Sequence, residues 1–485
     1  MRTSNAMSLV LGLVLLIGLS IAPSSTSAYS SYGPLVTGNT DFAVNLLGQL
    51  ETSNSPNIFF SPYSISACFG MVYAGARGQT ALQMAEALSL STNQTAVGSE
   101  FGALQAELSA QQTTNGIRLS AANGLWAQMN FPFLPAFLDN ATNNYEASVQ
   151  QVDFEADARQ ITDQVNEWVA GQTEGMISNL LQPGTLNAAT RLALVDAIYF
   201  NGGWQSIFDT NLTQVAPFYV SPSQWVNAPM MEQVEGVRYY QDNHFQAVEL
   251  PYLNSNLTMV VLLPKIPGPV ALTSAELSAV LGGLTPSWVD VKLPKFKLDL
   301  TLNLAPLLEH LGMVDAFSPG AADFSGIDGA TDLSIGSATH EAVVEVNETG
   351  TVAAGATVVT ITTSVAFNPI LFQADHPFVF LIRDTNSASI LFLGQVGDPT
   401  AGSTPSAATT RPLIQTTAGS FGFRNHQFGF QVASTNVTLV VEACTNLARG
   451  AWLPLRTLTL TNGSAYFSDS LSPNSPSRFY RVHSQ

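Results

Sequence analysis

The chain has 485 residues, of which 46% are hydrophobic and 11% charged, and its formal net charge is −18. This length is enough for two or more domains with a large core. With only 17 lysines and arginines, the chain lacks the basic surface that a nucleic-acid partner requires.

The N-terminus has the pattern of a secretory signal peptide. Arg2 precedes an apolar run over Leu9–Ile21, which ends in small polar residues up to Ala28. A basic start, a short apolar stretch and a small residue at its end are typical of a cleaved signal. A membrane anchor is the alternative, but the run is short for a span, and no later stretch is long and apolar enough. We therefore expect residues 1–28 to be removed and the mature protein, without a membrane span, to be extracellular or periplasmic.

The first half of the chain predicts helices and strands in alternation. Ser61 is the expected N-cap of a small-residue helix through Ala76, with Pro62 in its first turn. Thr80 is expected to cap the next helix, Ala81–Leu88. Apolar spacing predicts the other elements: helices over Asp41–Glu51 and Ala158–Thr173, and strands over Ile117–Gln128 and Arg191–Phe200.

The chain from there to residue 400 is richer in strands. Val289–Asp299 is predicted as one strand, Leu302–Leu311 as a helix, and Ala338–Val346 as a strand that leads into Glu345–Phe367. Two pairs of strands are expected around turns: Ala247–Tyr252 with Leu257–Leu263, and His376–Arg383 with Ser389–Val396.

The segment Glu345–Phe367 carries two conflicting signals. Its start is charged and turn-prone, and its last part, Thr357–Phe367, is an uncharged run rich in β-branched residues. Local propensity predicts a buried strand for that run. Gly350, Gly355 and the short side chains around them also suit a loop. The segment is therefore compatible with two conformations.

The C-terminal region has the pattern of a separate module. Residues 398–411 are rich in Pro, Thr, Ser and Ala, which is typical of a linker, and we place the linker at 401–418. Residues 419–485 are predicted as a small β-sandwich-like module, with Asn462-Gly463 as a turn. Its short alternating runs are Phe428–Val432, Val437–Glu442, Thr457–Leu460, Tyr466–Phe467 and Phe479–Val482. Binding to a surface or polymer and a passive folded tail are both compatible with this pattern.

Neither metal nor catalytic motifs are present. Cys68 and Cys444 lie far apart, in different predicted domains, and without a C-x-x-C pair or a Cys/His cluster we expect no metal and no cofactor. A triad of Ser64, His340 and Asp196 is conceivable, but a serine at the start of an apolar helix is usually a cap or a buried donor. No phosphate-binding loop or nucleophile elbow occurs. We therefore expect a buried free thiol at Cys68 and no enzyme activity.

Motifs spread over residues 29–400 resemble those of the serpins, the serine protease inhibitor family. They occur in the family's order: NIFFSPYSIS at Asn57–Ser66, VNEWV at Val165–Val169, LVDAIYFNGGW at Leu194–Trp204, VELPY at Val248–Tyr252, LPKFKL at Leu293–Leu298, LGMVDAF at Leu311–Phe317, ADFSGI at Ala322–Ile327, THEAVVEVNETGTVAAGAT at Thr339–Thr357, ADHPFVFLI at Ala374–Ile382 and ILFLGQVGDP at Ile390–Pro399.

The resemblance implies an α+β fold with three β-sheets, eight to nine helices and an exposed reactive-centre loop. It also implies a monomer whose partner is a serine or cysteine protease. The protease attacks the loop and forms an acyl-enzyme. The loop then inserts as a central strand of the largest sheet, which is an established conformational switch of serpins. Such an inhibitor is kinetically trapped before insertion.

The resemblance also assigns a hinge at the start of the loop. Glu348, Gly350 and Thr351 match the family's inhibitory hinge, and Val352 replaces a common glutamate at a position that would point outward. Small residues follow: Ala353, Ala354, Gly355 and Ala356. The side chains that would point inward in an inserted strand include no charge, proline or aromatic ring: Thr351, Ala353, Gly355, Thr357, Val359, Ile361 and Thr363. We expect insertion to be possible, with a non-inhibitory binding or storage serpin as the alternative.

Family spacing places the reactive bond at Ser364–Val365, with Thr363, Ala366 and Phe367 as alternatives. A small uncharged residue fits the shallow pocket of elastase- or subtilisin-like proteases, whereas Phe367 would suit a chymotrypsin-like target. No Arg or Lys lies between Gly350 and Pro369, which argues against trypsin-like targets.

Two structural sites follow from the same resemblance. Ser64, Asn166, Asp196 and His340 match a polar cluster beneath the main sheet that controls its opening. The family usually has Asn at the position of Asp196, and a buried aspartate needs a donor, which His340 can supply, so that the cluster becomes sensitive to pH. Trp204 matches the aromatic residue at the top of the sheet where the hinge enters, a role compatible with ordinary core packing.

Overall fold

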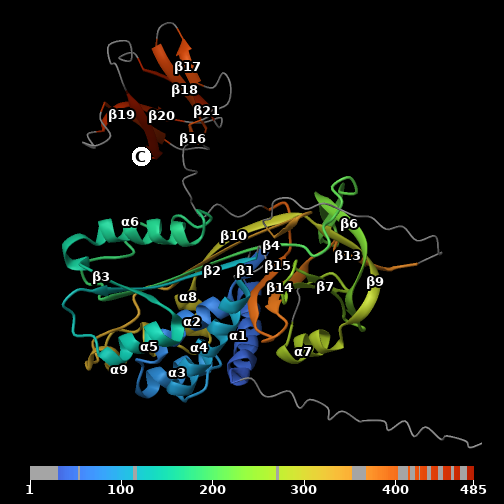
Figure 1. Ribbon diagram of the computed structural model, residues 1–485, viewed down its shortest axis with the longest axis horizontal. Helices are drawn as coiled ribbons and strands as arrows, with labels where there is room; N and C mark the ends of the chain where they lie inside the picture. The colour runs from blue at the N-terminus through green and yellow to red at the C-terminus, as the bar shows by residue number, and fades with distance from the viewer. Residues whose placement is uncertain are drawn as a thin grey trace, which may run out of the picture.

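The computed structural model describes residues 31–52, 55–112, 117–268, 272–351 and 368–401, together with residues 413–414, 421–424, 427–433, 438–445, 452–459, 464–469 and 478–484. Figure 1 shows α6 on one face of a β-sheet and α1 to α5 on the other. The α-helices of the described residues are α1 Gly33–Glu51, α2 Pro62–Tyr73, α3 Gly78–Ala87, α4 Gln94–Gln112, α5 Pro135–Tyr145, α6 Phe154–Gln172, α7 Ser274–Gly283, α8 Leu304–His310 and α9 Ser325–Asp328.

This first sheet has six strands in the order β10-β11-β12-β4-β2-β3. Its two longest strands, β4 and β2, are antiparallel neighbours. The strands are β2 Arg118–Gln128, β3 Ser148–Val152, β4 Leu192–Gly203, β10 Phe296–Asn303, β11 Thr339–Asn347 and β12 Gly350–Thr351. Strands that are distant in sequence therefore meet at the place where β12 lies.

The second sheet has nine strands, of which eight follow the order β1-β15-β14-β8-β7-β6-β9-β13 and β5 pairs with β6. The 18-residue strand β6 pairs with β5, β7 and β9, so two of the three expected sheets form one hydrogen-bonded network. The strands are β1 Asn57–Phe60, β5 Gln214–Ser221, β6 Gln224–Gln241, β7 Phe245–Pro251, β8 Leu257–Pro264, β9 Thr285–Pro294, β13 Ile370–Gln373, β14 Phe378–Asp384 and β15 Ile390–Val396.

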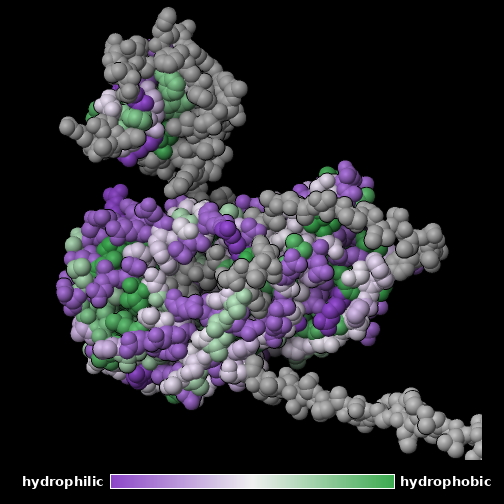
Figure 2. All heavy atoms as spheres, in the orientation of Figure 1, coloured by the Kyte–Doolittle hydropathy of each residue, from purple (hydrophilic) through white to green (hydrophobic). Residues whose placement is uncertain are grey.

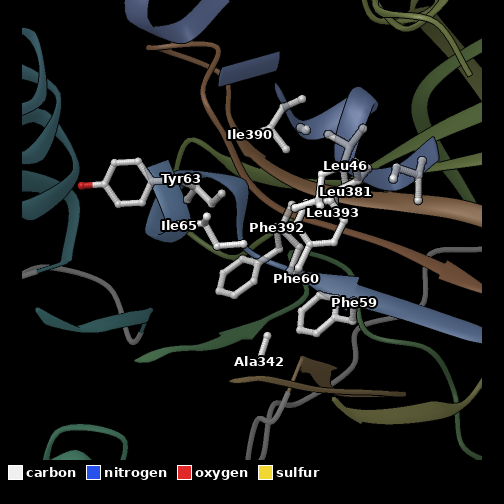
Figure 3. Close-up of a cluster of buried hydrophobic side chains, with 14 of the residues drawn as sticks. Leu46, Phe59, Phe60, Tyr63, Ile65, Ala342, Leu381, Ile390, Phe392 and Leu393 are labelled. Atoms are coloured by element: carbon white, nitrogen blue, oxygen red, sulfur yellow. The ribbon is translucent and has the colours of Figure 1, made fainter. Parts of the chain in front are cut away.

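The core lies between these sheets and the helices α1 and α2. Phe59 on β1 stacks on Phe392 of β15, with ring centroids 5.4 Å apart, and Ile65 of α2 and Ala342 of β11 belong to the same buried cluster (Figure 3). Aromatic and aliphatic side chains of this kind supply most of the favourable free energy of folding. Hydrophilic residues are spread over the visible face of the molecule (Figure 2).

Most of the predicted elements are confirmed, with shifted ends, and two predictions are wrong. Thr80 does not cap a helix: α3 already begins at Gly78, and the buried Thr80 hydroxyl instead accepts a hydrogen bond from the Asp323 amide. Val289–Asp299 is not one strand. Pro294 ends β9 because it has no N–H for the ladder, and after Lys295 the chain enters the other sheet as β10.

The C-terminal region forms two small sheets, with strand orders β16-β18-β17 (with β21 beside β18) and β20-β19-β22. A separate apolar cluster of Phe430, Val441, Leu458 and Phe467 holds them together. The strands are β16 Leu413–Ile414, β17 Phe421–Arg424, β18 Gln427–Ala433, β19 Thr438–Cys444, β20 Leu453–Thr459, β21 Ser464–Asp469 and β22 Phe479–Ser484. The predicted turn at Asn462-Gly463 lies outside the described residues.

Cys68 and Cys444 are both free thiols. Burial raises the pKa of Cys68 well above its usual value, which keeps this group in the thiol form. The residue is nevertheless partly exposed, so the expectation of a free thiol at Cys68 is confirmed but the expectation that it is buried holds only in part. Within the described part of the chain, no helix has the length and apolar character of a membrane span, and no three His, Cys, Asp or Glu side chains gather as a metal site.

Candidate functional site

The hinge residues Gly350 and Thr351 form the short strand β12, which lies between β11 and β4 and pairs antiparallel with both. Farther along, β11 and β4 pair directly with each other, in parallel, between Glu341–Val343 and Ala197–Tyr199. The hinge therefore separates β11 from β4 at one end of the six-stranded sheet. A few residues away, the same two strands are paired directly with each other. A strand that continued from β12 would have to separate β11 from β4 along this line.

Only glycine can occupy position 350 in this arrangement. The φ angle of Gly350 is +153°, and a Cβ atom there would lie 2.3 Å from the Gly202 carbonyl oxygen and 2.7 Å from the Gly203 Cα. Such contacts are far closer than any side chain tolerates, and the backbone conformation also favours glycine. The glycines that face each other across β12 and β4 thus allow the hinge to enter the sheet.

Thr351 is fully buried, and its hydroxyl lies 2.7 Å from the hydroxyl of Tyr252. Burial raises the pKa of Tyr252, so the phenol stays neutral and can form a hydrogen bond with the Thr351 hydroxyl. Trp204 stacks on Tyr252, with ring centroids 4.7 Å apart. Its indole Nε1 donates to the Asn347 carbonyl at 2.9 Å. Trp204 therefore contacts the hinge, and its role in the entry of the hinge into the sheet stays a prediction.

Glu348 is the first residue after β11, and its contacts attach the start of the hinge to neighbouring segments. Its carboxylate accepts hydrogen bonds from Lys295 Nζ at 2.8 Å and Thr213 Oγ1 at 2.9 Å. Its backbone carbonyl accepts one from the Phe208 amide at 2.9 Å. Burial opposes ionisation, but the hydrogen bonds from Lys295 and Thr213 outweigh it and lower the pKa of Glu348. The hinge is thus attached by charge-assisted bonds to the segments before β5 and β10.

The polar cluster beneath the sheet is formed by three of its four predicted members. Ser64 Oγ donates to Asp196 Oδ1, and His340 Nδ1 lies 3.6 Å from Asp196 Oδ2. His340 Nε2 accepts the Ser61 amide hydrogen at 3.0 Å, which places the neutral ring's proton on Nδ1, facing the carboxylate. Asn166 is not bonded to these three: its side chain makes two hydrogen bonds to the backbone of Leu181.

These contacts connect α2, β4 and β11 by buried side chains. Ser61 is also the N-cap of α2, as predicted, and accepts the Ser64 amide hydrogen at 3.1 Å. Separation of β11 from β4 would move His340 relative to Asp196. The role of this cluster in sheet opening stays a prediction, now with a stated geometry.

The expected coupling between His340 and Asp196 stays a prediction. Urea unfolding of the wild type and of Asp196→Asn, compared at two pH values, tests this coupling. Ser64→Ala, which leaves the carboxylate in place, is the matched control, and parallel pH profiles of Asp196→Asn and wild type would contradict the coupling.

A second carboxyl lies where β11 and β4 meet. Burial, with the nearby Asp299 carboxylate, raises the pKa of Glu341 from 4.5 to about 7. The folded state then binds more protons than the unfolded state between these two values, so wild-type stability falls as pH rises through this window. Glu341→Gln removes this penalty, and we expect the variant to be more stable than wild type by about 2 kcal/mol near pH 8 and equally stable near pH 4. Glu345→Gln, an exposed carboxylate on the same strand, is the control, and an equal gain in both variants at pH 8 would refute the assignment.

Several residues of the site were not singled out from the sequence. The hinge is contacted by Lys295, Tyr252 and Thr213. The first two lie within the motifs LPKFKL and VELPY, but the motifs do not show that these residues contact the hinge. Their partners are distant in sequence, so local patterns could not identify their role. The remaining predicted residues lie outside the described part of the chain: Ala353, Ala354, Gly355, Ala356, Thr363, Ser364, Val365, Ala366 and Phe367.

Comparison with known proteins covers most of the chain. Residues 37–399 match the family described as serpin (serine protease inhibitor). Leukocyte elastase inhibitor of Equus caballus is 38% identical over 379 residues, which is 75% of this chain and 99% of that protein. Serpin B6 of Pongo abelii is 37% identical over 378 residues, with the same shares.

Solved structures give the same fold. Human thyroxine-binding globulin has 30% sequence identity and a TM-score of 0.67, with 76% of this chain and 100% of that chain covered. Uncleaved ovalbumin has 28% identity and a TM-score of 0.66 at the same coverage. The C-terminal region lies beyond the residues matched by the family.

Proposed function

This chain belongs to the serpin (serine protease inhibitor) family, which is not a family of enzymes, and we propose that it inhibits serine endopeptidases as a suicide substrate. In this proposal a protease cleaves the loop that follows β12, forms an acyl-enzyme and is trapped when the loop inserts between β11 and β4. The observation that carries the proposal is the position of β12, which already occupies the start of that path.

The residues that follow β12 support the same proposal. Ala353, Ala354, Gly355 and Ala356 are all small, so the leading part of the inserted strand brings neither a charge nor a large side chain between β11 and β4. The similarity to leukocyte elastase inhibitor supports an elastase-like target, as does the small residue Ser364 at the proposed reactive bond.

Incubation with elastase, subtilisin and chymotrypsin tests the proposal. We expect a covalent complex that survives denaturing electrophoresis and a released fragment that begins at Val365, identified by mass spectrometry. A fragment that begins at Ser364, Phe367 or Asn368 would relocate the reactive bond and, in the last case, favour a chymotrypsin-like target. Cleavage without a complex, and without a rise in thermal stability afterwards, would refute inhibition.

Cleavage without a covalent complex would favour a non-inhibitory serpin that binds or stores a ligand. The likeness to thyroxine-binding globulin, whose solved structure contains bound thyroxine, motivates this alternative. The position of β12 favours inhibition, because it places the hinge at the start of the path that loop insertion would follow.

We also propose that the protein is secreted after removal of residues 1–28 and that residues 419–485 form a separate module beyond the serpin domain. N-terminal sequencing of the protein recovered outside the producing cell tests the first part, and a start near Tyr29 is expected. Limited proteolysis within residues 401–418 tests the second: the serpin part should retain its thermal unfolding temperature after the cut.

A further inference from the structure

The hairpin of β5 and β6 presents an uncharged, largely apolar face to solvent. Along β5, Phe218 is buried, whereas Val215 and Tyr219 are 72% and 42% exposed. On β6, Trp225 is 63% exposed. Because alternate residues of a strand point to the same side, the outward set can be read from the pairing of Val215 with Pro229 and of Pro217 with Asn227. We call this set the hairpin face: Val215, Pro217, Tyr219, Trp225, Asn227 and Pro229.

The hairpin that carries this face has no charged residue. Residues 210–231 contain no Asp, Glu, Lys, Arg or His, although the chain has a formal net charge of −18. Depletion of charge together with exposed aromatic rings is the composition of the centre of a protein–protein interface. The exposed ring of Trp225 leaves a large apolar area in water, and burial of this area against a partner would be favourable.

Hydrogen bonds attach the hairpin to both ends of the loop segment. Thr213, just before β5, donates to the Glu348 carboxylate at the start of the hinge. The Tyr219 amide donates to the Asp375 carbonyl at 2.7 Å, just after β13, where the chain has returned from the loop. Residues 349–374 between these two points also contain no charged residue. The hairpin is therefore hydrogen-bonded near both ends of residues 349–374, and this segment is uncharged like the hairpin itself.

We propose that the hairpin face is a docking site for the target endopeptidase, separate from the bond that the protease cleaves. The inference rests on the proposed function, because it supplies the second contact of a protease already engaged on the loop. The complementary protease surface would be uncharged and apolar, able to cover Trp225 and Tyr219. This contact would raise the rate of association and select among proteases that accept the same small residue in their primary pocket.

The outer edge of β5 is poorly suited to another kind of contact, the addition of a strand from a second molecule. β5 pairs with β6 at the margin of the nine-stranded sheet, and Pro217 in its middle has no N–H to offer an added strand. Addition of a strand from a second molecule is therefore hindered along β5. The face of the hairpin, rather than its edge, is available for contact.

The test uses elastase and the double variant Tyr219→Ser/Trp225→Ser of the full chain. We expect the second-order rate constant of inhibition to fall about tenfold or more, since aromatic anchors at the centre of an interface have effects of this size. The number of inhibitor molecules consumed per trapped protease should stay unchanged, because loop insertion does not involve these side chains. Leu82→Ser, which removes an exposed apolar residue of α3 instead, is the control and should leave both quantities unchanged.

A catalytically inactive elastase, with its nucleophilic serine replaced by alanine, gives a second readout. Its dissociation constant for the chain should rise by a similar factor in the double variant. An unchanged inhibition rate with an intact covalent complex would overturn the docking site and leave the proposed function standing. A change in the consumption ratio, or a concentration-dependent dimer of the wild-type chain that the double variant abolishes, would overturn it too. Absence of any covalent complex with the wild-type chain would refute the proposed function, and the docking site with it.

Discussion

Thr351→Arg is expected to convert the protein from an inhibitor into a substrate. Thr351 is fully buried between β11 and β4, and its hydroxyl has Tyr252 as its partner. An arginine there would bring an unpaired charge into the sheet, at a cost of several kcal/mol. Each 1.4 kcal/mol added to a barrier slows a step about tenfold, so insertion would be slower by about a hundredfold or more. The acyl-enzyme would then hydrolyse before the loop enters the sheet.

The measurement is the ratio of covalent complex to cleaved inhibitor on a denaturing gel, after reaction with the protease that the wild type traps. Cleavage should continue at the wild-type bond while the complex band disappears. Thr351→Ser keeps a small side chain and the hydroxyl that faces Tyr252, so it should retain the complex. If Thr351→Arg still formed the complex in wild-type yield, insertion through the β12 position would be refuted.

Reversal of the charge at Glu348 is expected to release the hinge. Glu348 is 8% exposed and is held by Lys295 and Thr213, so Glu348→Lys would place two ammonium groups together in a largely buried site. The pair is only partly buried, because the Lys295 side chain is 38% exposed, so its loss costs about 1.5–3 kcal/mol. The proposed mechanism requires a kinetically trapped uncleaved state, so the effect is read as a rate of inactivation rather than as an equilibrium.

The half-life of inhibitory activity at elevated temperature measures this effect, and it should shorten by about tenfold or more in Glu348→Lys. Lys295→Glu should act in the same direction but less, because Lys295 is more exposed and can move into solvent. The double variant restores an opposite-charge pair and should recover part of the loss, which a double-mutant cycle quantifies. If the two single effects simply added in the double variant, Lys295 and Glu348 would not act as a pair.

The experiments on Thr351→Arg and Glu348→Lys test two different steps: entry of the loop into the sheet, and attachment of the hinge before cleavage. Thr351 lies between β11 and β4, at the start of the proposed path of insertion, whereas Glu348 holds the segment that precedes it. A variant at position 351 should therefore change the fate of the acyl-enzyme. One at position 348 should change how long the uncleaved protein stays in its trapped state.

The sequence by itself determined the fold and the order of segments along the loop. Ser61 as a cap and the continuous apolar strand around Asp196 are local patterns, and they hold in the structure because propensity and burial agree there. The absence of charge from Gly350 to Pro369 is likewise a property of the sequence alone. It is why insertion could be predicted before the position of β12 was known.

Only the tertiary structure decided which residues hold the hinge and the polar cluster. Tyr252 and Trp204 reach the hinge across 99 and 143 positions of sequence, and Lys295 joins them there, because β4, β11 and the ends of β7 and β9 converge at one end of the sheet. Asn166 belonged to the predicted cluster but bonds to Leu181, since α6 presents it to the segment that follows the helix. Local patterns report which face of an element is buried, whereas side-chain partners depend on strand order, and strand order in this fold is set by pairings between distant segments.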